Sequence, residues 1–325
     1  MSRPTFAVVL PDHTGLEATL RCLRAVAVGV EMASGVDAAK VLAGCGAHLR
    51  SVWVHASMLR ETLAYMTEAR MRVPVAVFSP ETHEATLDMA LHQPVVVGLL
   101  AWGEEGPRAW EVMYLARRIM APAEDPPHMA SLMPFGATTV AWQPSTTEEQ
   151  RQIVTRIEAM CQRLGVERRV ASSVSTAAHE LLMNAMYDAP VGPTGQPKYA
   201  LDRTASIRLL PEEVPTLRFT VGGRWIGLDI IDPFGRLPRN RFFEGVLRGH
   251  RSMTGSTASA LDTSHGGAGL GLHTLYQSGA MLRAELTPLV QTHVSWVYDR
   301  AMNRRDRSRA PRSLYFLPNT TRRAR

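Results

Sequence analysis

The sequence predicts an α/β protein made of two domains joined by a short linker. Residues 5–120 alternate five times between a short apolar run and an amphipathic helical pattern. Prolines and acidic residues are then concentrated in residues 121–128 (APAEDPPH), a composition typical of a linker. A second series of helical and apolar strand patterns follows. With 325 residues, the chain is long enough for two domains that each bury a core.

The amino-terminal pattern predicts a parallel sheet covered by helices on both faces. The expected strands are Phe6–Leu10, Gly29–Ala33, Ser51–His55, Val73–Phe78 and Pro94–Leu100. The expected helices are Leu16–Ala27, Asp37–Cys45, Leu59–Met71, Glu81–Leu91 and Pro107–Met120. This order resembles the receiver domain of two-component signalling, a flavodoxin-like doubly wound fold.

The receiver chemistry is incomplete in this sequence. A working receiver has a phosphoacceptor aspartate at the end of its third strand, where this chain has His55. Only Asp12 remains of the acidic pair expected after the first strand, and no lysine follows the fifth. Ser79 fits the hydroxyl position of the fourth strand. We therefore expect residues 1–120 to form a pseudo-receiver that serves dimerisation or partner docking.

The second domain is expected to begin, after a linker at 121–135, with an edge strand at Thr138–Trp142. Ser145 and Glu148 have the spacing of a capping box that opens the next helix. A later apolar run, Trp225–Ile231, follows a Gly-Gly turn and reads as a strand.

Three polar residues share a spacing of four on the helix after Gly165. Glu180, Asn184 and Asp188 would lie on one helical face, with Leu181, Leu182 and Ala185 toward the core. An amide oxygen is a suitable ligand for Mg²⁺, which prefers oxygen and shares its coordination with phosphates. The alternative is an ordinary solvated face of an amphipathic helix.

Residues 265–272 (HGGAGLGL) form a glycine-rich stretch before a predicted helix. Gly267, Gly269 and Gly271 leave the backbone N–H groups accessible to anionic oxygens, and helix N-termini attract phosphate. No Lys-Ser/Thr pair follows, which excludes a Walker loop, and the spacing differs from the dinucleotide fingerprint. A glycine-rich turn without a ligand is the alternative.

Asp232 ends the apolar strand 225–231 and opens the sequence DPFG. A buried carboxylate needs a partner, because an unpaired buried charge is costly. The partner could be a ligand, or Asp232 could simply cap the following turn.

These segments, in this order, resemble the GHKL (Bergerat-fold) ATP-binding domain of gyrase, chaperone ATPases and histidine kinases. The strand–helix–helix order is most similar to the anti-sigma-factor serine kinase branch. The resemblance implies an α+β sandwich over residues 136–300 that binds ATP and Mg²⁺. It implies that Glu180 activates the attacking group, that Asn184 holds Mg²⁺ and that Asp232 reads adenine. The other implied nucleotide-contacting residues are Asp188, Gly235, Gly267, Ala268, Gly269, Leu270, Gly271 and Thr292.

The sequence departs from the family after Asp232. The usual pattern there is Asp-x-Gly-x-Gly, whereas here only Gly235 remains, shifted by one position. Residues 236–265 correspond to the family's mobile lid and carry five arginines, which could clamp phosphates or simply decorate an exposed helix. These are Arg236, Arg239, Arg241, Arg248 and Arg251.

The chain has a formal net charge of +6. Residues 299–325 contain nine arginines and two aspartates, a balance of +7, so the rest is close to neutral at −1. An Arg-rich tail at 301–325 suits acidic partners, nucleic acid or anionic lipid, although Tyr315 and Phe316 are its only aromatic residues and nucleic-acid recognition is disfavoured. Strand-like Ser313–Leu317 interrupts it.

The three cysteines form no metal or disulfide signature, and no apolar run approaches the ~20 residues that span a bilayer. We expect a cytoplasmic signalling protein that binds ATP and Mg²⁺ and phosphorylates or sequesters a protein partner. The alternative is a non-catalytic switch or scaffold that acts through protein–protein interaction.

Overall fold

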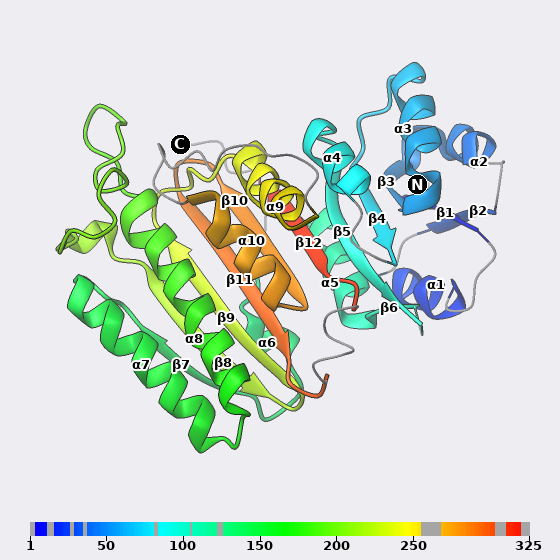
Figure 1. Cartoon of the computed structure of the whole chain (residues 1–325). Coiled ribbons are helices and arrows are strands. Elements are labelled where there is room, and N and C mark those ends of the chain that lie inside the picture. The colour runs from blue at the N-terminus through cyan, green and yellow to red at the C-terminus, as the bar shows by residue number, and fades with distance from the viewer. Residues whose placement is uncertain are drawn as a thin grey trace. The chain divides into compact units, whose positions relative to one another are not determined.

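The protein is an α/β fold of mixed β-sheet and helices (Figure 1). The computed structural model describes residues 4–11, 16–26, 29–34, 38–80, 84–104, 106–121, 126–254, 268–302 and 310–319. The chain divides into two compact units. Unit 1 comprises Met1–Asp125 and Arg309–Tyr315, and unit 2 comprises Pro126–Ser308 and Phe316–Arg325. Unit 1 is therefore discontinuous in sequence.

Unit 1 contains all five strands and all five helices expected between residues 5 and 120. Its parallel strands occur in the order β2-β1-β3-β4-β5, the order of flavodoxin-like sheets. They are β1 (Thr5–Leu10), β2 (Gly29–Ser34), β3 (Leu49–His55), β4 (Val75–Ser79) and β5 (Val96–Gly103). The short β6 (Gly106–Pro107) pairs with β5.

Helices lie on both faces of this parallel sheet (Figure 1). They are α1 (Leu16–Arg24), α2 (Ala38–Cys45), α3 (Leu59–Glu68), α4 (Glu84–His92) and α5 (Ala109–Met120). Helices α1 and α5 pack together, and α2 packs against α3. Burial from both sides explains why the strands are apolar throughout rather than alternating. Trp53 is fully buried between Phe6 and Phe78, with ring centroids 5.8 and 5.7 Å away.

Strand β12 (Ser313–Pro318) adds an antiparallel neighbour to β5, so the sheet is mixed at this point. Leu314 and Tyr315 pair antiparallel with Leu99 and Gly98 of β5. The Tyr315 ring lies against the Cα of Gly98, where any side chain would collide with it. The expected strand at 313–317 is thus present, inside the segment predicted as an Arg-rich tail.

A buried carboxylate holds β12 in place. Glu111 of α5 is fully buried, and its Oε2 accepts hydrogen bonds from Ser313 Oγ and Tyr315 Oη, each at 2.5 Å. Its Oε1 pairs with Arg108 at 2.5 Å. Ser313 Oγ in turn accepts from the Ala101 N–H at 2.9 Å. Both carboxylate oxygens are thereby satisfied inside the core, as burial of a charge requires.

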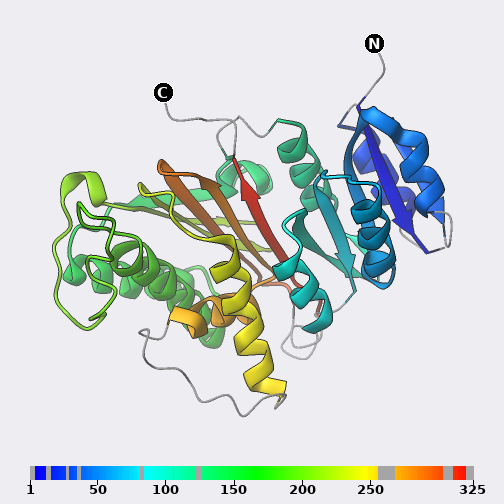
Figure 2. The same ribbon diagram turned by 90° about the horizontal axis from the view of Figure 1, so that it is seen from above.

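Unit 2 has an antiparallel sheet in the order β10-β11-β9-β8-β7. Its strands are β7 (Thr138–Trp142), β8 (Thr216–Gly222), β9 (Trp225–Asp232), β10 (Met281–Thr287) and β11 (Gln291–Asp299). Its helices are α6 (Met129–Leu132), α7 (Thr147–Arg163), α8 (Arg168–Met183), α9 (Arg239–Thr254) and α10 (Ala268–Ser278). Helices α7 to α10 gather on one face of the sheet, and α6 lies on the other (Figures 1 and 2).

The capping box of α7 lies one residue later than the sequence pattern suggests. Thr146 is the N-cap, and Thr146 and Glu149 form the reciprocal pair. The predicted pair, Ser145 and Glu148, has the same spacing. The residue after the N-cap, Thr147, is tied to a distant segment, since its hydroxyl accepts a hydrogen bond from the Ile207 N–H at 2.9 Å. Within the described ranges, no helix is both long and apolar enough to cross a bilayer.

Replacing Tyr315 by Phe tests the anchor of β12. The substitution keeps the ring but removes one donor to a fully buried carboxylate, so we expect the free energy of unfolding to fall by about 1–3 kcal/mol. Urea unfolding followed by circular dichroism measures it. Tyr65→Phe, which removes a half-exposed hydroxyl from α3, is the control and should change stability by less than about 0.5 kcal/mol. Equal stability of the two variants would contradict this role.

Candidate functional site

Helix α8 positions the predicted acid and amide. Its apolar face, including Val174, Ala178 and Leu182, is buried, and Glu180 emerges half-buried on another side. The helix then continues as a π-helical turn, Asn184–Asp188, closed by a 3.0 Å bond from the Ala189 N–H to the Asn184 carbonyl. A π-helical turn holds more residues than an α-helical turn. The spacing of four therefore no longer places Glu180, Asn184 and Asp188 in one line along the helix. Single π-turns of this kind occur often at functional sites.

Tyr187 in the π-helical turn fixes the segment that follows it. The buried Tyr187 hydroxyl donates to the Ala205 carbonyl at 2.7 Å and lies 2.8 Å from Thr147 Oγ1. Residues 202–207 are therefore attached both to the π-turn and to the start of α7. This attachment brings Arg203 to Asn184 and Asp188.

Arg203 bridges the amide and the second acid of the predicted site. Its Nη2 donates to Asn184 Oδ1 at 3.1 Å and lies 3.5 Å from Asp188 Oδ2. Burial raises the pKa of the Asp188 carboxyl, against the lowering effect of Arg203 and Arg241. The negative charge of Glu180 raises it further. Glu180, Asn184 and Asp188 thus belong to one cluster together with two arginines.

Glu180 also touches the start of α10. A Cβ on Gly271 would collide with Glu180 Oε2, so the carboxylate keeps its present place only while residue 271 is glycine. Ala268, Gly269 and Leu270 form the first turn of α10 rather than a preceding loop, because the helix already begins at Ala268. Gly267 lies outside the described residues.

Asp232 and Thr292 face each other across β9 and β11. Asp232 Oδ1 accepts a hydrogen bond from the Phe234 N–H at 3.0 Å, and the polar groups of Gly235 and Thr292 lie near enough to lower the pKa of this carboxylate. Burial raises its pKa to about 6, against the lowering effect of these groups. A carboxylate offers about four acceptor sites. Asp232 therefore caps its own turn, the alternative considered from sequence.

Gly235 has a structural role at the tip of the β10–β11 hairpin. Its φ is +60°, in the left-handed region, and its carbonyl accepts from the Leu289 N–H at 3.1 Å. A Cβ would collide with the Thr287 carbonyl oxygen and lie 2.7 Å from the Val290 nitrogen. This close approach explains why a glycine stands here although the family spacing is shifted.

The predicted residues thus form two groups. One is Glu180, Asn184 and Asp188 with Gly271 at the start of α10, and the other is Asp232, Gly235 and Thr292. Strand β9 packs against both α8 and the π-helical turn, which places the groups on the same face of unit 2. Arg203 was not anticipated. It lies in an irregular segment, and no local pattern links it to Asn184.

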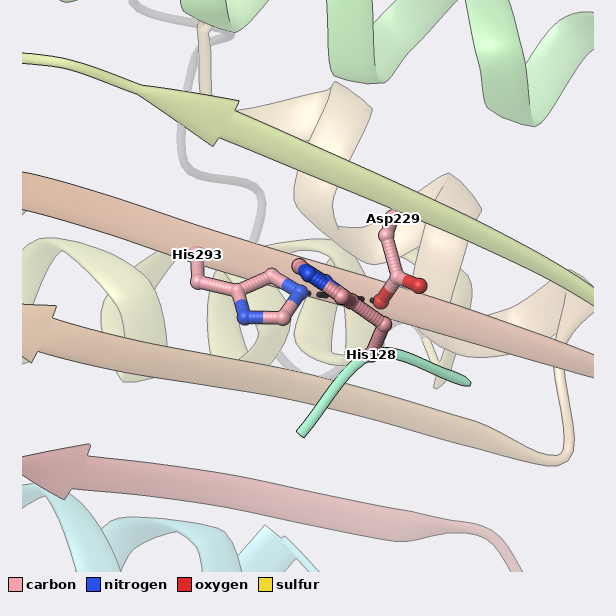
Figure 3. A group of neighbouring side chains, drawn as sticks. All are labelled: His128, Asp229 and His293. Atoms are coloured by element: carbon pink, nitrogen blue, oxygen red, sulfur yellow. Dashed lines mark hydrogen bonds and ion pairs between the residues drawn. The ribbon is translucent and has the colours of Figure 1, made fainter. Parts of the chain in front are cut away.

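A second polar cluster, formed by His128, Asp229 and His293, lies beside the start of α6 (Figure 3). The ligating atoms of His128, Asp229 and His293 lie within 4.8 Å of one another. Asp229 Oδ1 and His293 Nε2 are 2.9 Å apart, and the Met129 N–H donates to Asp229 Oδ2 at 2.8 Å. A sequence signal existed: Arg283, Glu285, His293 and Ser295 alternate with apolar residues along two neighbouring strands.

This second cluster is an ion-pair network rather than a metal centre. The fully buried Arg283 has its Nη2 at 3.4 Å from His293 Nε2 and 3.7 Å from Asp229 Oδ1. Although burial alone would raise the pKa of Asp229, hydrogen bonds from His293 and Ser295 and the charge of Arg283 hold it at about 2. A divalent cation placed among these ligands would lie beside a guanidinium, which opposes its binding.

Comparisons with known proteins add little to this geometry. No protein-family model and no curated protein matches the sequence. Among solved structures, the chain is similar to a chain of the SiaB–SiaC complex from Pseudomonas aeruginosa, with 13% sequence identity and a TM-score of 0.31. The match covers 49% of this chain and 88% of that one. A likeness at this TM-score carries no weight, so the function is inferred from the side chains themselves.

Two glycine-to-alanine substitutions distinguish a glycine that the backbone fold requires, Gly235, from one that leaves room for a site residue, Gly271. Gly235→Ala forces a left-handed alanine against backbone atoms, so we expect a loss of more than about 1–2 kcal/mol of stability. In Gly271→Ala the added methyl meets only the end of the Glu180 side chain, which can move, and alanine favours a helix interior by about 1 kcal/mol. Gly271→Ala should therefore keep its thermal midpoint while displacing Glu180. Calorimetric unfolding distinguishes them, and equal losses would contradict the assignment.

The raised pKa of Asp232 predicts a specific pH dependence. The folded protein holds this proton more tightly than the unfolded chain, since the pKa rises from 3.8 to about 6. Stability should therefore fall as pH rises from about 4 to 6, by at most about 3 kcal/mol. Asp232→Asn, which cannot ionise, should lack this component. Urea unfolding of both proteins at several pH values measures the difference, and parallel pH profiles would contradict the prediction.

Proposed function

We propose that this protein is an ATP-binding regulatory protein of the GHKL class, with unit 2 as a Bergerat-fold α+β sandwich. The observation that carries the proposal is the contact between Glu180 and Gly271. These residues are 91 positions apart, and they join a helical carboxylate to the amino-terminal end of α10. The antiparallel sheet of unit 2, with its four long helices on one face, supports the same class.

Each proposed role follows from chemistry that the side chain can perform. Glu180 would orient or deprotonate the attacking hydroxyl or water, and the first turn of α10 would hold phosphate oxygens through its N–H groups. Phosphoryl transfer depends mainly on such positioning and charge stabilisation. Asp232 would read the adenine amine through the carboxylate oxygen that does not bond the Phe234 N–H.

Mg²⁺, which the family implies, does not fit the described side chains as they stand. The amide oxygen of Asn184 is the metal ligand that the resemblance assigns, and it accepts a hydrogen bond from Arg203. Asp188, the nearest second oxygen ligand, is paired with the same guanidinium. We therefore assign no step of the proposed reaction to a bound metal.

Unit 1 would serve as a pseudo-receiver for docking a protein partner or a second copy of the chain. His55, at the phosphoacceptor position, uses its Nδ1 to accept the Ser57 N–H at 3.2 Å and so caps the turn after β3. A residue with this structural role replaces the phosphorylated aspartate. Such docking would suit a regulatory rather than a metabolic function.

A second candidate function is a non-catalytic nucleotide-dependent switch or scaffold. It is favoured because two side chains of the proposed nucleotide site already form hydrogen bonds within the protein. Asn184 is bonded to Arg203 and Asp232 to its own turn. A ligand that displaced either contact would move residues 202–207 or the turn 233–235. Such a displacement changes shape without needing turnover.

Calorimetric titration with ATP tests binding, and radiolabelled ATP tests turnover. Glu180→Gln should retain ATP affinity but lower hydrolysis or transfer by about 100-fold or more, because a positioned general base contributes at least that factor. Glu212→Gln, an exposed neutralisation in the same unit, is the matched control and should behave as the unaltered protein. Binding without turnover in the unaltered protein would favour the switch. Absence of binding would overturn the proposal.

A further inference from the structure

We propose that Arg203 supplies the positive charge that Mg²⁺ supplies elsewhere in this class, so that nucleotide binding at this site does not require a divalent metal. This inference rests on the proposed nucleotide-binding function. It concerns the juxtaposition of Arg203 with Asn184 and Asp188, which no sequence motif indicates.

The guanidinium occupies the position that a metal ion would take between two oxygen ligands. The same nitrogen, Arg203 Nη2, lies 3.1 Å from Asn184 Oδ1 and 3.5 Å from Asp188 Oδ2. The Asn184 oxygen uses one of its two lone pairs for this hydrogen bond, so a metal ion on the other lone pair would lie close to the guanidinium, whose positive charge opposes it. Mg²⁺ would need oxygen ligands at about 2.0–2.1 Å, which requires the guanidinium to leave.

Displacing Arg203 would be costly because the side chains around it are largely shielded from water. The Arg203 side chain is 16% exposed and that of Asp188 is 13% exposed. Mg²⁺ and the guanidinium cannot both occupy the space between these oxygens, since like charges at short range repel strongly where water is scarce. The metal would therefore compete with a cation that the fold already holds in place.

The backbone around Arg203 is fixed by contacts that do not involve a ligand. Asp202 Oδ1 accepts from both the N–H and the hydroxyl of Thr204, at 3.0 and 2.6 Å. The Ala205 carbonyl accepts from Tyr187, and the Ile207 N–H donates to Thr147. The chain thus holds Arg203 from both sides, which indicates a built-in position.

A guanidinium at this place suits a polyphosphate directly. Arginine binds phosphate through paired N–H groups, and its charge persists at every accessible pH. Arg241 adds to the positive field, since it also acts on Asp188. The nucleotide of the proposed function would therefore present its phosphates to Arg203 as well as to the first turn of α10.

Titration of the full chain with a fluorescent ATP analogue, in EDTA and in millimolar Mg²⁺, tests the inference. The unaltered protein should bind with the same dissociation constant in both buffers, within about twofold. Arg203→Gln should weaken binding in EDTA by about tenfold, equivalent to 1.4 kcal/mol. Mg²⁺ should then restore part of that affinity, because the substitution releases Asn184 and Asp188. Arg208→Gln, an exposed neutralisation on the same segment, is the matched control and should match the unaltered protein.

The possible outcomes distinguish nucleotide binding itself from its independence of a divalent metal. Metal-independent binding that becomes Mg²⁺-responsive only in Arg203→Gln supports the inference, whereas a merely structural role would weaken binding equally in both buffers and would overturn it. Binding that requires Mg²⁺ in the unaltered protein overturns this inference and leaves the proposed function standing. No binding of the analogue in either buffer overturns the proposed function and this inference with it. Circular dichroism of each variant confirms that loss of binding is not loss of fold.

Discussion

The buried carboxylate of Glu111 is the interaction on which the architecture of unit 1 depends. Its two oxygens are shared among Arg108, Ser313 and Tyr315, and two of these partners lie more than 200 residues away in sequence. Such a contact must offset the entropy of closing a very long loop, which grows only slowly with loop length. It does so inside a core where an unpaired charge would be prohibitive. The last strand is therefore held by chemistry as well as by its backbone pairing.

An arginine lies among potential metal ligands at two places in unit 2, once on each face of its sheet. Arg203 lies between Asn184 and Asp188, and Arg283 lies beside Asp229 and His293. Both sites contain residue types that commonly ligate metals. In each, a planar guanidinium satisfies several oxygens or nitrogens at once, with a charge that cannot be lost by deprotonation. Residue type alone is thus a poor guide to metal binding when an arginine is held at the centre.

The sequence predicts the elements of this fold better than the contacts between them. Strands buried on both faces are recognisable as unbroken apolar runs, so β1 to β5 could be located from sequence. The capping box of α7 lies one residue later than the sequence pattern predicts, because two Ser/Thr–Glu pairs share the same spacing and only Thr146 and Glu149 form the reciprocal bonds. The π-turn at Asn184 leaves no periodic signal. Arg203 was missed because its position depends on Tyr187 and Thr147, which are remote in sequence.

The site residues illustrate the same limit. Glu180 and Gly271 could be singled out from local motifs, and the fold brings them into contact. Asp232 and Gly235 could be singled out as well, but their contacts within the structure are with their own turn and the neighbouring hairpin. A motif records which residues stand in order along a chain. It does not record whether their hydrogen-bonding capacity is already used by the fold.

The discontinuity of unit 1 has a consequence for biosynthesis. A nascent chain emerges from the ribosome amino end first, so β5 is made about 200 residues before the strand that pairs with its outer edge. During that interval an apolar strand offers unpaired N–H and C=O groups, the kind of template that promotes association between chains. Growing chains of this protein should therefore depend on chaperones until the segment around Tyr315 is released, and truncated translation products should be the species most prone to aggregate.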